Sequence, residues 1–558
     1  MGQTAGSLPL KRFVNDPREI VRDALEGYLW THPDVQLLEG YPETKVLVQK
    51  SWRRSNGQVA VISGGGSGHE PADVGMIGEG LLTAVVCGEV FAAPSAYAVA
   101  QCLEAVTGPA GTLVVVRSNP GTRLNFLSAV KEARSRLQLR IRVVCVADDV
   151  ASSLKSGDHH RDFKQARGIA GSLLVYKIAG AAAAAGLNLE QVYQETVLAA
   201  AAVRTQGVCF TSCTIPGTQT ARPLPPDEME VGLGLHGEPG LRVKATAETS
   251  AKEVVETIMS QLGSFVPPKG PLCVMLNNLG TVAQIEMSVV AGQVMRSELG
   301  SRIKLFIGPA HLMTALDTNG ISISVLPLQD SEEPEEELDE AQGSELSRLG
   351  LRAERLLAAT SCRHWVPAMM PCQPQSFRAE SATRRLQRRS LSGRFPDSEH
   401  PVARSLLERA CRAVLGAENE LNALDAQVAD GDLGRSMSNA ARLLLSELNS
   451  GHLPLVYPGP LFLRIADIMR CVDGMLAALL SVFFGRAGRA LMPRRSRPLL
   501  HKSSSSHSGL GAYKVHKAHT RRLRSADSGL HRQTAASSSL SLSNACGWQR
   551  EGVLRAFR

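Results

Sequence analysis

The stretch VISGGGSGHEP, residues Val61–Pro71, sets an apolar run before three consecutive glycines, a serine, another glycine, a histidine and a glutamate. Glycines in a turn after a strand let backbone N–H groups approach a ligand closely, because no Cβ blocks them. The segment has neither the G-x-G-x-x-G spacing of a dinucleotide fingerprint nor the Lys-Ser/Thr of a P-loop. A glycine-rich turn alone is more often structural than functional. His69 and Glu70, which follow directly, favour a pocket for a small polar molecule.

Outward from this stretch, continuous apolar runs alternate with helix-forming segments between about residues 58 and 326. Such runs are typical of strands whose two faces are both covered by helices. The pattern predicts an α/β region of two subdomains, with mixed or parallel sheets flanked by helices. The predicted strands are Val59–Ser63, Thr112–Arg117, Ile141–Ala147, Leu272–Asn278, Ile303–Gly308 and Ile321–Leu326, and the clearest predicted helix is Ala179–Thr205.

Composition divides the chain into four parts. We expect an α/β domain over residues 10–330, an acidic and then basic, Pro- and Ser-rich linker over 331–398, a helical domain over 400–488 and a disordered tail over 489–558. The acidic block Gln329–Glu345 is typical of a solvated linker. The tail is rich in Ser, Arg and His without an apolar period, so it cannot bury enough apolar area to become ordered.

The net charge of +8 comes from the C-terminal end of the chain. Residues 491–558 hold 13 Lys and Arg against two acidic residues, so the remainder carries a net charge of about −3. A nucleic-acid-binding arm is a minor alternative, and we expect no nucleic-acid partner. Eleven cysteines without a C-x-x-C pair indicate reduced thiols, and the apolar run Gly474–Phe484 is too short to span a bilayer. We therefore expect a cytoplasmic protein without a membrane partner.

Two further segments contain polar side chains that are candidates for a functional site. In VGLGLHGEPG, residues Val231–Gly240, His236 lies among four glycines, which is typical either of a surface-loop histidine or of an exposed functional one. In LNALDAQVADGDLG the aspartates are spaced five and two apart. If Asp425 ends a helix and Asp430 and Asp432 lie on a turn, three oxygen donors converge and suit Mg²⁺. The bland alternative is an ordinary Asp-Gly-Asp turn.

Together the three segments resemble the dihydroxyacetone kinase family in its fused two-domain form. Further matching motifs are GTLVVVRSNPGTRLNF (Gly111–Phe126), SCTIPG (Ser212–Gly217) and NNLG (Asn277–Gly280). The resemblance covers residues 10–326 strongly and residues 400–486 moderately. It implies a substrate-binding DhaK domain followed by an all-α, nucleotide-binding DhaL domain of the helical-barrel type. Because residues 400–488 span only part of such a barrel, we expect the DhaL domain to be incomplete, and the resemblance also implies a homodimer.

The resemblance implies roles residue by residue. His236 would hold the carbonyl of dihydroxyacetone or glyceraldehyde as a covalent hemiaminal, which selects carbonyl compounds over glycerol. His69 would help to polarise the hydroxyl that attacks the γ-phosphate of ATP. The implied triose-binding residues are Gly66, Ser67, Gly68, His69, Arg117 and Thr122, the nucleotide-binding residues are Asp430, Gly431, Asp432 and Leu433, and the Mg²⁺ ligands are Asp425, Asp430 and Asp432. For animal members it also implies cleavage of FAD to AMP and cyclic riboflavin phosphate, with Mn²⁺ or Co²⁺ as alternative ions.

Three positions depart from the family pattern. Arg117 replaces a lysine, and Thr122 replaces an aspartate that acts in catalysis; loss of a positioned acid or base typically costs ~10²–10⁴ in rate. Met469–Gly474 departs from a glycine-rich phosphate loop. Two hypotheses follow. One is an ATP-dependent triose kinase with FAD-AMP lyase as a further activity. The alternative is a catalytically impaired paralogue or isoform that binds a carbonyl triose or a partner protein.

Overall fold

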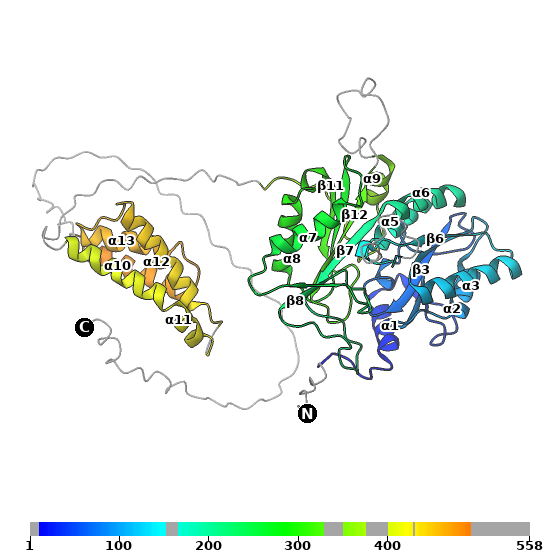
Figure 1. The fold of residues 1–558 in the computed structure, drawn as a ribbon, viewed down its shortest axis with the longest axis horizontal. Helices are drawn as coiled ribbons and strands as arrows, with labels where there is room; N and C mark the ends of the chain where they lie inside the picture. The colour runs from blue at the N-terminus through cyan, green and yellow to red at the C-terminus, as the bar shows by residue number, and fades with distance from the viewer. Residues whose placement is uncertain (1–10, 152–165, 329–349, 375–399, 428–429, 493–558) are drawn as a thin grey trace, which may run out of the picture. The chain divides into compact units, whose positions relative to one another are not determined.

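The computed structural model describes residues 11–151, 166–328, 350–374, 400–427 and 430–492 (Figure 1). The chain divides into two compact units, residues 1–378 and 379–558. The acidic block at residues 329–345 and nearly all of the predicted tail lie outside the described residues. The solvated linker predicted for the block and the disorder predicted for the tail therefore stay predictions.

Two six-stranded mixed sheets form the framework of the first unit. In spatial order the first sheet contains β1 (Val35–Leu37), β2 (Val46–Gln49), β4 (Ala84–Val90), β3 (Ala60–Ser67), β5 (Thr112–Arg117) and β6 (Ile141–Val146). The second contains β11 (Ile303–Ala310), β10 (Leu272–Asn278), β12 (Gly320–Pro327), β7 (Arg204–Cys209), β8 (Glu228–Val231) and β9 (Leu241–Lys244). Strands β4, β3, β5 and β6 are parallel, as are β10 and β11, and the other neighbours are antiparallel. The predicted α/β region with mixed sheets is confirmed.

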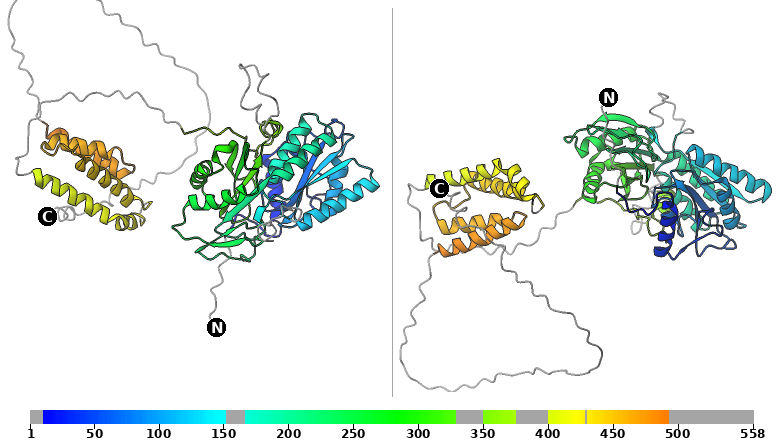
Figure 2. Two further views of the ribbon diagram at one scale, coloured as in Figure 1. Left: turned by 45° about the horizontal axis from the view of Figure 1, so that its top comes forward. Right: turned by 90° about the horizontal axis from the view of Figure 1, so that it is seen from below.

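The helices of the first unit lie in layers around the two sheets (Figure 1), and Figure 2 shows the same order from two further directions. They are α1 (Ile20–Thr31), α2 (Ala96–Val106), α3 (Pro120–Arg136), α5 (Ser172–Ala184), α6 (Leu189–Ala202), α7 (Ala251–Gly263), α8 (Gln284–Arg296) and α9 (Gly350–Leu357), with short 3₁₀ turns η1 (Val74–Met76) and η3 (Gly300–Arg302). On the outer face of the first sheet, Ile62 packs in one core with Val99 of α2 and Phe126 of α3. On the outer face of the second sheet, Val274 packs with Ile258 of α7 and other residues of α7 and α8.

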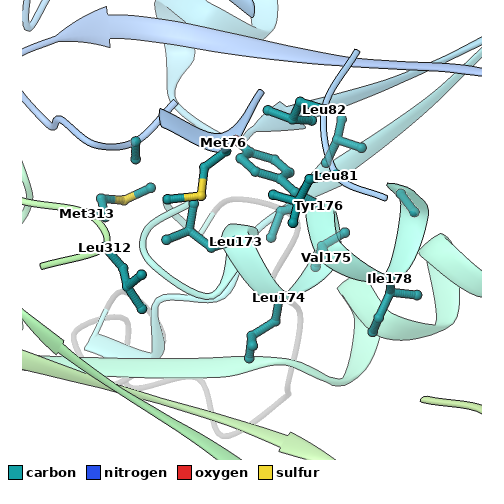
Figure 3. Close-up of a cluster of buried hydrophobic side chains, with 14 of the residues drawn as sticks. Met76, Leu81, Leu82, Leu173, Leu174, Val175, Tyr176, Ile178, Leu312 and Met313 are labelled. Carbon is teal, nitrogen blue, oxygen red and sulfur yellow. The ribbon is translucent and has the colours of Figure 1, made fainter. Parts of the chain in front are cut away.

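Helices α5 and α6 occupy the layer between the sheets. Because side chains alternate along a strand, Val61 faces this layer while its neighbour Ile62 faces outward. The central core joins Val61 of the first sheet, Leu173 of α5 and Met275 of the second sheet. Figure 3 shows Leu173 close to Met76, which precedes β4, and to Leu312, which follows β11. One continuous core therefore holds the two sheets together through α5.

The glycine-rich segment is not the turn that the sequence predicts. Strand β3 continues to Ser67, and its glycines pair in parallel with β4. A Cβ at Gly64 would lie 2.1 Å from the carbonyl oxygen of Val86, and one at Gly65 would lie 2.1 Å from a guanidinium nitrogen of Arg117. The role of these glycines is therefore to allow close packing against a strand and a side chain, and it is not to make the segment flexible.

Other differences concern boundaries and short elements. The helix predicted over Ala179–Thr205 is two helices, because Gly186 takes a positive φ of 81° and Asn188 starts α6 with a capping box. Strands β1, β2, β8 and β9 are too short for a period to show, and β4 and β7 carry a glycine that interrupts the apolar run. The other predicted strands agree within a few residues.

Part of the predicted linker packs on the first unit. Ala353 and Leu356 of α9 belong to the central core, and so do Cys362 and Trp365. The backbone N–H of Ser361 donates to the carbonyl oxygen of Glu79 at 3.1 Å, which fixes this segment beside η1. Helix α9 spans only eight residues, and the composition of the surrounding residues assigned the segment to the linker.

The described part of the second unit consists of helices. They are α10 (His400–Gly416), α11 (Glu418–Asp425), α12 (Leu433–Asn449), α13 (Pro458–Met469) and α14 (Met475–Ala490). Their shared core leaves a stripe of apolar side chains on α14 exposed, namely Met475, Leu479, Val482 and Phe483. The all-α character fits the DhaL prediction, whereas closure into a barrel stays a prediction. Within the described ranges, no helix has the length and apolar character needed to cross a bilayer.

Candidate active site

The end of β3 packs closely against the segment that follows β4. The Ser67 hydroxyl donates to the carbonyl oxygen of Gly88 at 2.8 Å, and the Phe91 N–H donates to the carbonyl oxygen of Ser67 at 2.9 Å. A Cβ at Gly66 would lie 2.8 Å from the Phe91 carbonyl carbon, and one at Gly68, where φ is +99°, would lie 2.9 Å from the Phe91 ring. Three of the predicted triose-binding residues therefore form one wall beside Phe91.

His69 is held by Thr314, which lies in the loop between β11 and β12 of the second sheet. Its Nδ1 lies 2.8 Å from the carbonyl oxygen of Thr314, and because a carbonyl only accepts, Nδ1 carries the hydrogen and Nε2 does not. That Nε2 is buried and has no hydrogen-bond partner among the described residues. Burial lowers the pKa of His69 to about 3, and the nearby His236 and Arg117 add to the lowering, so the ring is neutral near pH 7. Thr314 also donates its N–H to the His69 carbonyl oxygen at 3.0 Å.

His236 lies in the loop between β8 and β9 and is held by Glu238. The Glu238 carboxylate accepts from the His236 ring Nδ1 at 3.1 Å and from the His236 backbone N–H at 3.0 Å. Burial raises the pKa of Glu238, but the hydrogen bond and charge of His236 outweigh it and lower the pKa to about 2. Gly237, with φ +83°, makes the tight turn between the two residues. The ring nitrogen left available for chemistry is therefore Nε2.

The rings of His69, His236 and Phe91 form a triangle. The ring centroids of His69 and His236 are 5.1 Å apart, and Phe91 lies 5.0 Å from the first and 5.1 Å from the second. His69 is almost completely buried, while the His236 side chain is 25% exposed. The two predicted catalytic residues thus lie next to each other, with the apolar Phe91 ring beside both and solvent access on the His236 side.

Arg117 lies behind β3 with its guanidinium against Gly65. It forms an ion pair with Asp73 in which both side chains are 3% exposed, and the Tyr176 hydroxyl donates to the same carboxylate at 3.2 Å. Thr122 is buried in the first turn of α3. The predicted contacts of Arg117 and Thr122 with a triose stay predictions. In the structure, the buried Arg117 side chain packs against β3, the strand that leads to the site.

The three predicted metal-binding carboxylates come together in the second unit. Helix α11 ends at Asp425, as expected, and one ligand oxygen from each of Asp425, Asp430 and Asp432 lies within 4.8 Å of the others. Asp425 Oδ2 also accepts the backbone N–H groups of Asp432 and Leu433 at 3.1 and 3.3 Å, at the start of α12. Gly431 makes the turn with φ +76°. Three hard oxygen donors at this spacing fit Mg²⁺.

Sequence reasoning did not identify three residues of the site. Glu238 stands two residues after His236 in the same motif, so the pairing of a histidine with a nearby carboxylate was a usable signal. Thr314 and Phe91 carried no such signal, because a backbone carbonyl and an apolar ring become part of a site only through the fold.

Comparisons with known proteins agree with this architecture. The Dak1 domain model matches residues 26–344. The dihydroxyacetone kinase of Citrobacter freundii is 37% identical over 86% of this chain and 80% of its own length, and the human triokinase/FMN cyclase is 33% identical over 88% and 81%. The crystal structure of the C. freundii kinase in complex with AMP-PNP and Mg²⁺ has a TM-score of 0.63 at 36% identity and covers 86% of this chain and 83% of its own.

These relatives and the fold define an enzyme of the phosphotransferase class. The family model spans more than half of the chain, and the relatives named above exceed 30% identity over four fifths of their length. The chain belongs to the dihydroxyacetone kinase family.

Proposed function

We propose that the chain transfers the γ-phosphoryl group of ATP to a hydroxyl group of dihydroxyacetone or glyceraldehyde. The observation that carries this proposal is the pair of imidazoles: the rings of His69 and His236 are 5.1 Å apart, and the buried Nε2 of His69 has no partner among the described residues. Such a nitrogen needs a hydrogen-bond donor, which a substrate hydroxyl supplies. The names of the relatives support this substrate class.

The two histidines have different tasks. The Nε2 lone pair of His236 attacks the carbonyl carbon, the carbonyl electron pair moves to oxygen, and the oxygen takes a proton from solvent to complete the hemiaminal. Only a carbonyl compound can be held in this way, so glycerol is excluded. The Nε2 of His69 accepts the hydrogen of the substrate hydroxyl that attacks the phosphoryl group.

Asp425, Asp430 and Asp432 would hold the Mg²⁺ that accompanies ATP. When bound, the ion neutralises charge on the phosphate oxygens, so transfer depends mainly on positioning. The backbone at Gly431 and Leu433 lies at the start of α12, where the helix dipole favours phosphate groups. The names of the triokinase/FMN cyclase relatives support a further, FMN cyclase activity. We extend the proposal to cleavage of FAD at the same nucleotide site, with Mn²⁺ or Co²⁺ as alternative ions.

The test is a coupled assay of ADP release with ATP-Mg²⁺ and dihydroxyacetone. We expect turnover at or above about 1 s⁻¹, the low end for ordinary enzymes. His236→Ala should lose dihydroxyacetone-dependent turnover, whereas His452→Ala, which removes an exposed histidine of the second unit, should retain it. A folded parent protein that binds both ligands without transferring phosphate would refute the proposal and favour the impaired, triose-binding alternative.

A further inference from the structure

We propose that Glu238 is a positioning residue that makes Nε2 the reacting nitrogen of His236, and that Arg167 fixes Glu238 for this task. The inference rests on the proposed function and extends it to the groups that select the nucleophilic atom. It concerns residues of the first unit alone.

The two oxygens of Glu238 bind two different parts of one residue. Oε1 lies 3.1 Å from the His236 ring Nδ1, and Oε2 accepts the His236 backbone N–H at 3.0 Å. The backbone N–H of His236 holds the Glu238 carboxylate in place. Rotation of the His236 ring about its side-chain bonds would therefore break the hydrogen bond between Nδ1 and Oε1. A carboxylate partner at Nδ1 also fixes the tautomer, so the lone pair is on Nε2.

Arg167 holds this carboxylate from the other side. Its Nη1 lies 3.9 Å from Glu238 Oε2, while Nη2 donates to the carbonyl oxygen of Gly232 at 2.9 Å and Nε donates to Asp149 Oδ2 at 2.7 Å. The Asp149 side chain is 2% exposed, so the guanidinium is anchored on a buried group. A Cβ at Gly234 would lie 2.0 Å from Glu238 Oε2 and 2.3 Å from Arg167 Nη1. The second glycine of the motif therefore provides the space in which the two side chains meet.

The negative charge of Glu238 stabilises the product of the covalent step. When Nε2 bonds to the carbonyl carbon, the ring keeps its hydrogen on Nδ1 and becomes a cation, while the former carbonyl oxygen takes a proton from solvent. The low pKa of Glu238, about 2, keeps its carboxylate ionised beside that cation. A charge-assisted hydrogen bond of this kind is roughly twice as strong as a neutral one. The carboxylate therefore stabilises the adduct as well as orienting the ring.

The test uses Glu238→Gln, which keeps the shape and removes the charge, and Glu238→Asp, which keeps the charge and shortens the reach. Asp227→Asn is the matched control, because it neutralises a carboxylate that pairs with the exposed Lys244. Nitrogen-15 spectra of histidine-labelled full-length protein report the tautomer of His236 without ligand. Carbonyl-labelled ¹³C dihydroxyacetone reports adduct formation, kinetics give KM and kcat, and melting temperatures verify folding.

We expect the parent and Asp227→Asn to hold His236 in the Nδ1–H tautomer and to form the adduct at Nε2. Glu238→Gln should mix the tautomers and raise the KM for dihydroxyacetone about 10–100-fold, by analogy with the loss of a carboxylate behind a metal-binding histidine, with a smaller change in kcat. Glu238→Asp should recover part of the affinity. A parental tautomer and KM in folded Glu238→Gln would overturn the positioning role alone. A parent protein that forms no adduct at His236 would instead refute the proposed covalent function.

Discussion

Replacing Arg117 with methionine should destabilise the first unit by about 3–5 kcal/mol, because it leaves the Asp73 carboxylate buried without its cation. Both side chains of the pair are 3% exposed, so water cannot take the place of the guanidinium. The Tyr176 hydroxyl, 3.2 Å from Asp73 Oδ1, remains as a neutral donor. Methionine retains much of the length and apolar volume of the arginine stem, so the loss of a charge partner, and not a large cavity, dominates the cost.

Urea and thermal unfolding of four proteins measure this cost: the parent, Arg117→Met, Asp73→Asn and the double variant. The double variant carries neither charge, so it should be more stable than the sum of the two single losses predicts. Arg136→Met is the control, because the exposed pair of Arg136 with Glu132 should contribute almost nothing. An Arg117→Met protein as stable as the parent, or purely additive losses in the double variant, would refute the reasoning.

Three further predictions concern the two sites. Gly234→Ala should raise the KM for dihydroxyacetone about 10-fold or more with little change in melting temperature. Its Cβ would push apart the ends of the Glu238 and Arg167 side chains and so end the support of His236, and a parental KM would contradict this. The pKa of His69 is about 3 in the folded protein and about 6.5 in the unfolded chain, so its contribution to stability is complete above about pH 6.5. As the pH falls toward 3 this contribution is lost, by up to about 1.4 kcal/mol per pH unit. His69→Asn should therefore reduce the dependence of stability on pH in thermal melts from about pH 7 to 4, and a dependence equal to that of the parent would contradict the prediction. Asp430→Asn should reduce the thermal shift produced by ATP-Mg²⁺, whereas Asp467→Asn should leave it intact; equal shifts would remove Asp430 from the metal site.

Strands whose apolar runs are unbroken could be predicted from the sequence. Strand β10, Leu272–Asn278, is buried along its whole length, so its pattern carries the full signal. Strand β4 is as well buried over most of its length, but Gly88 breaks its run, and the residues that decide its pairing lie on β3. When the register of a strand depends on glycines in a neighbouring strand, the sequence of that strand alone does not predict it.

The candidate site shows the same division. The convergence of Asp425, Asp430 and Asp432 was predicted on the condition that Asp425 ends a helix, and helix α11 meets that condition. The three residues lie within eight positions, so the contact depends on local structure. The support of His69 by Thr314 joins residues that are 245 positions apart, and no local pattern reports it. The glycines of β3 were recognised as unusual, but the reason for them is the close approach of the Val86 backbone and the Arg117 guanidinium, which only the folded chain brings against them.

Helix α5 packs against both sheets, and Thr314, in the loop between β11 and β12, holds the backbone and ring of His69, which follows β3. Proteins with two separately folded lobes often close around a ligand by rotating one lobe about a hinge. Here a rotation of one sheet against the other would disrupt the core that both sheets share. The shared core therefore keeps the buried His69 beside the partly exposed His236 without a hinge between the sheets. Since the His236 and Glu238 side chains are 25% and 40% exposed, a ligand meets His236 before it meets His69.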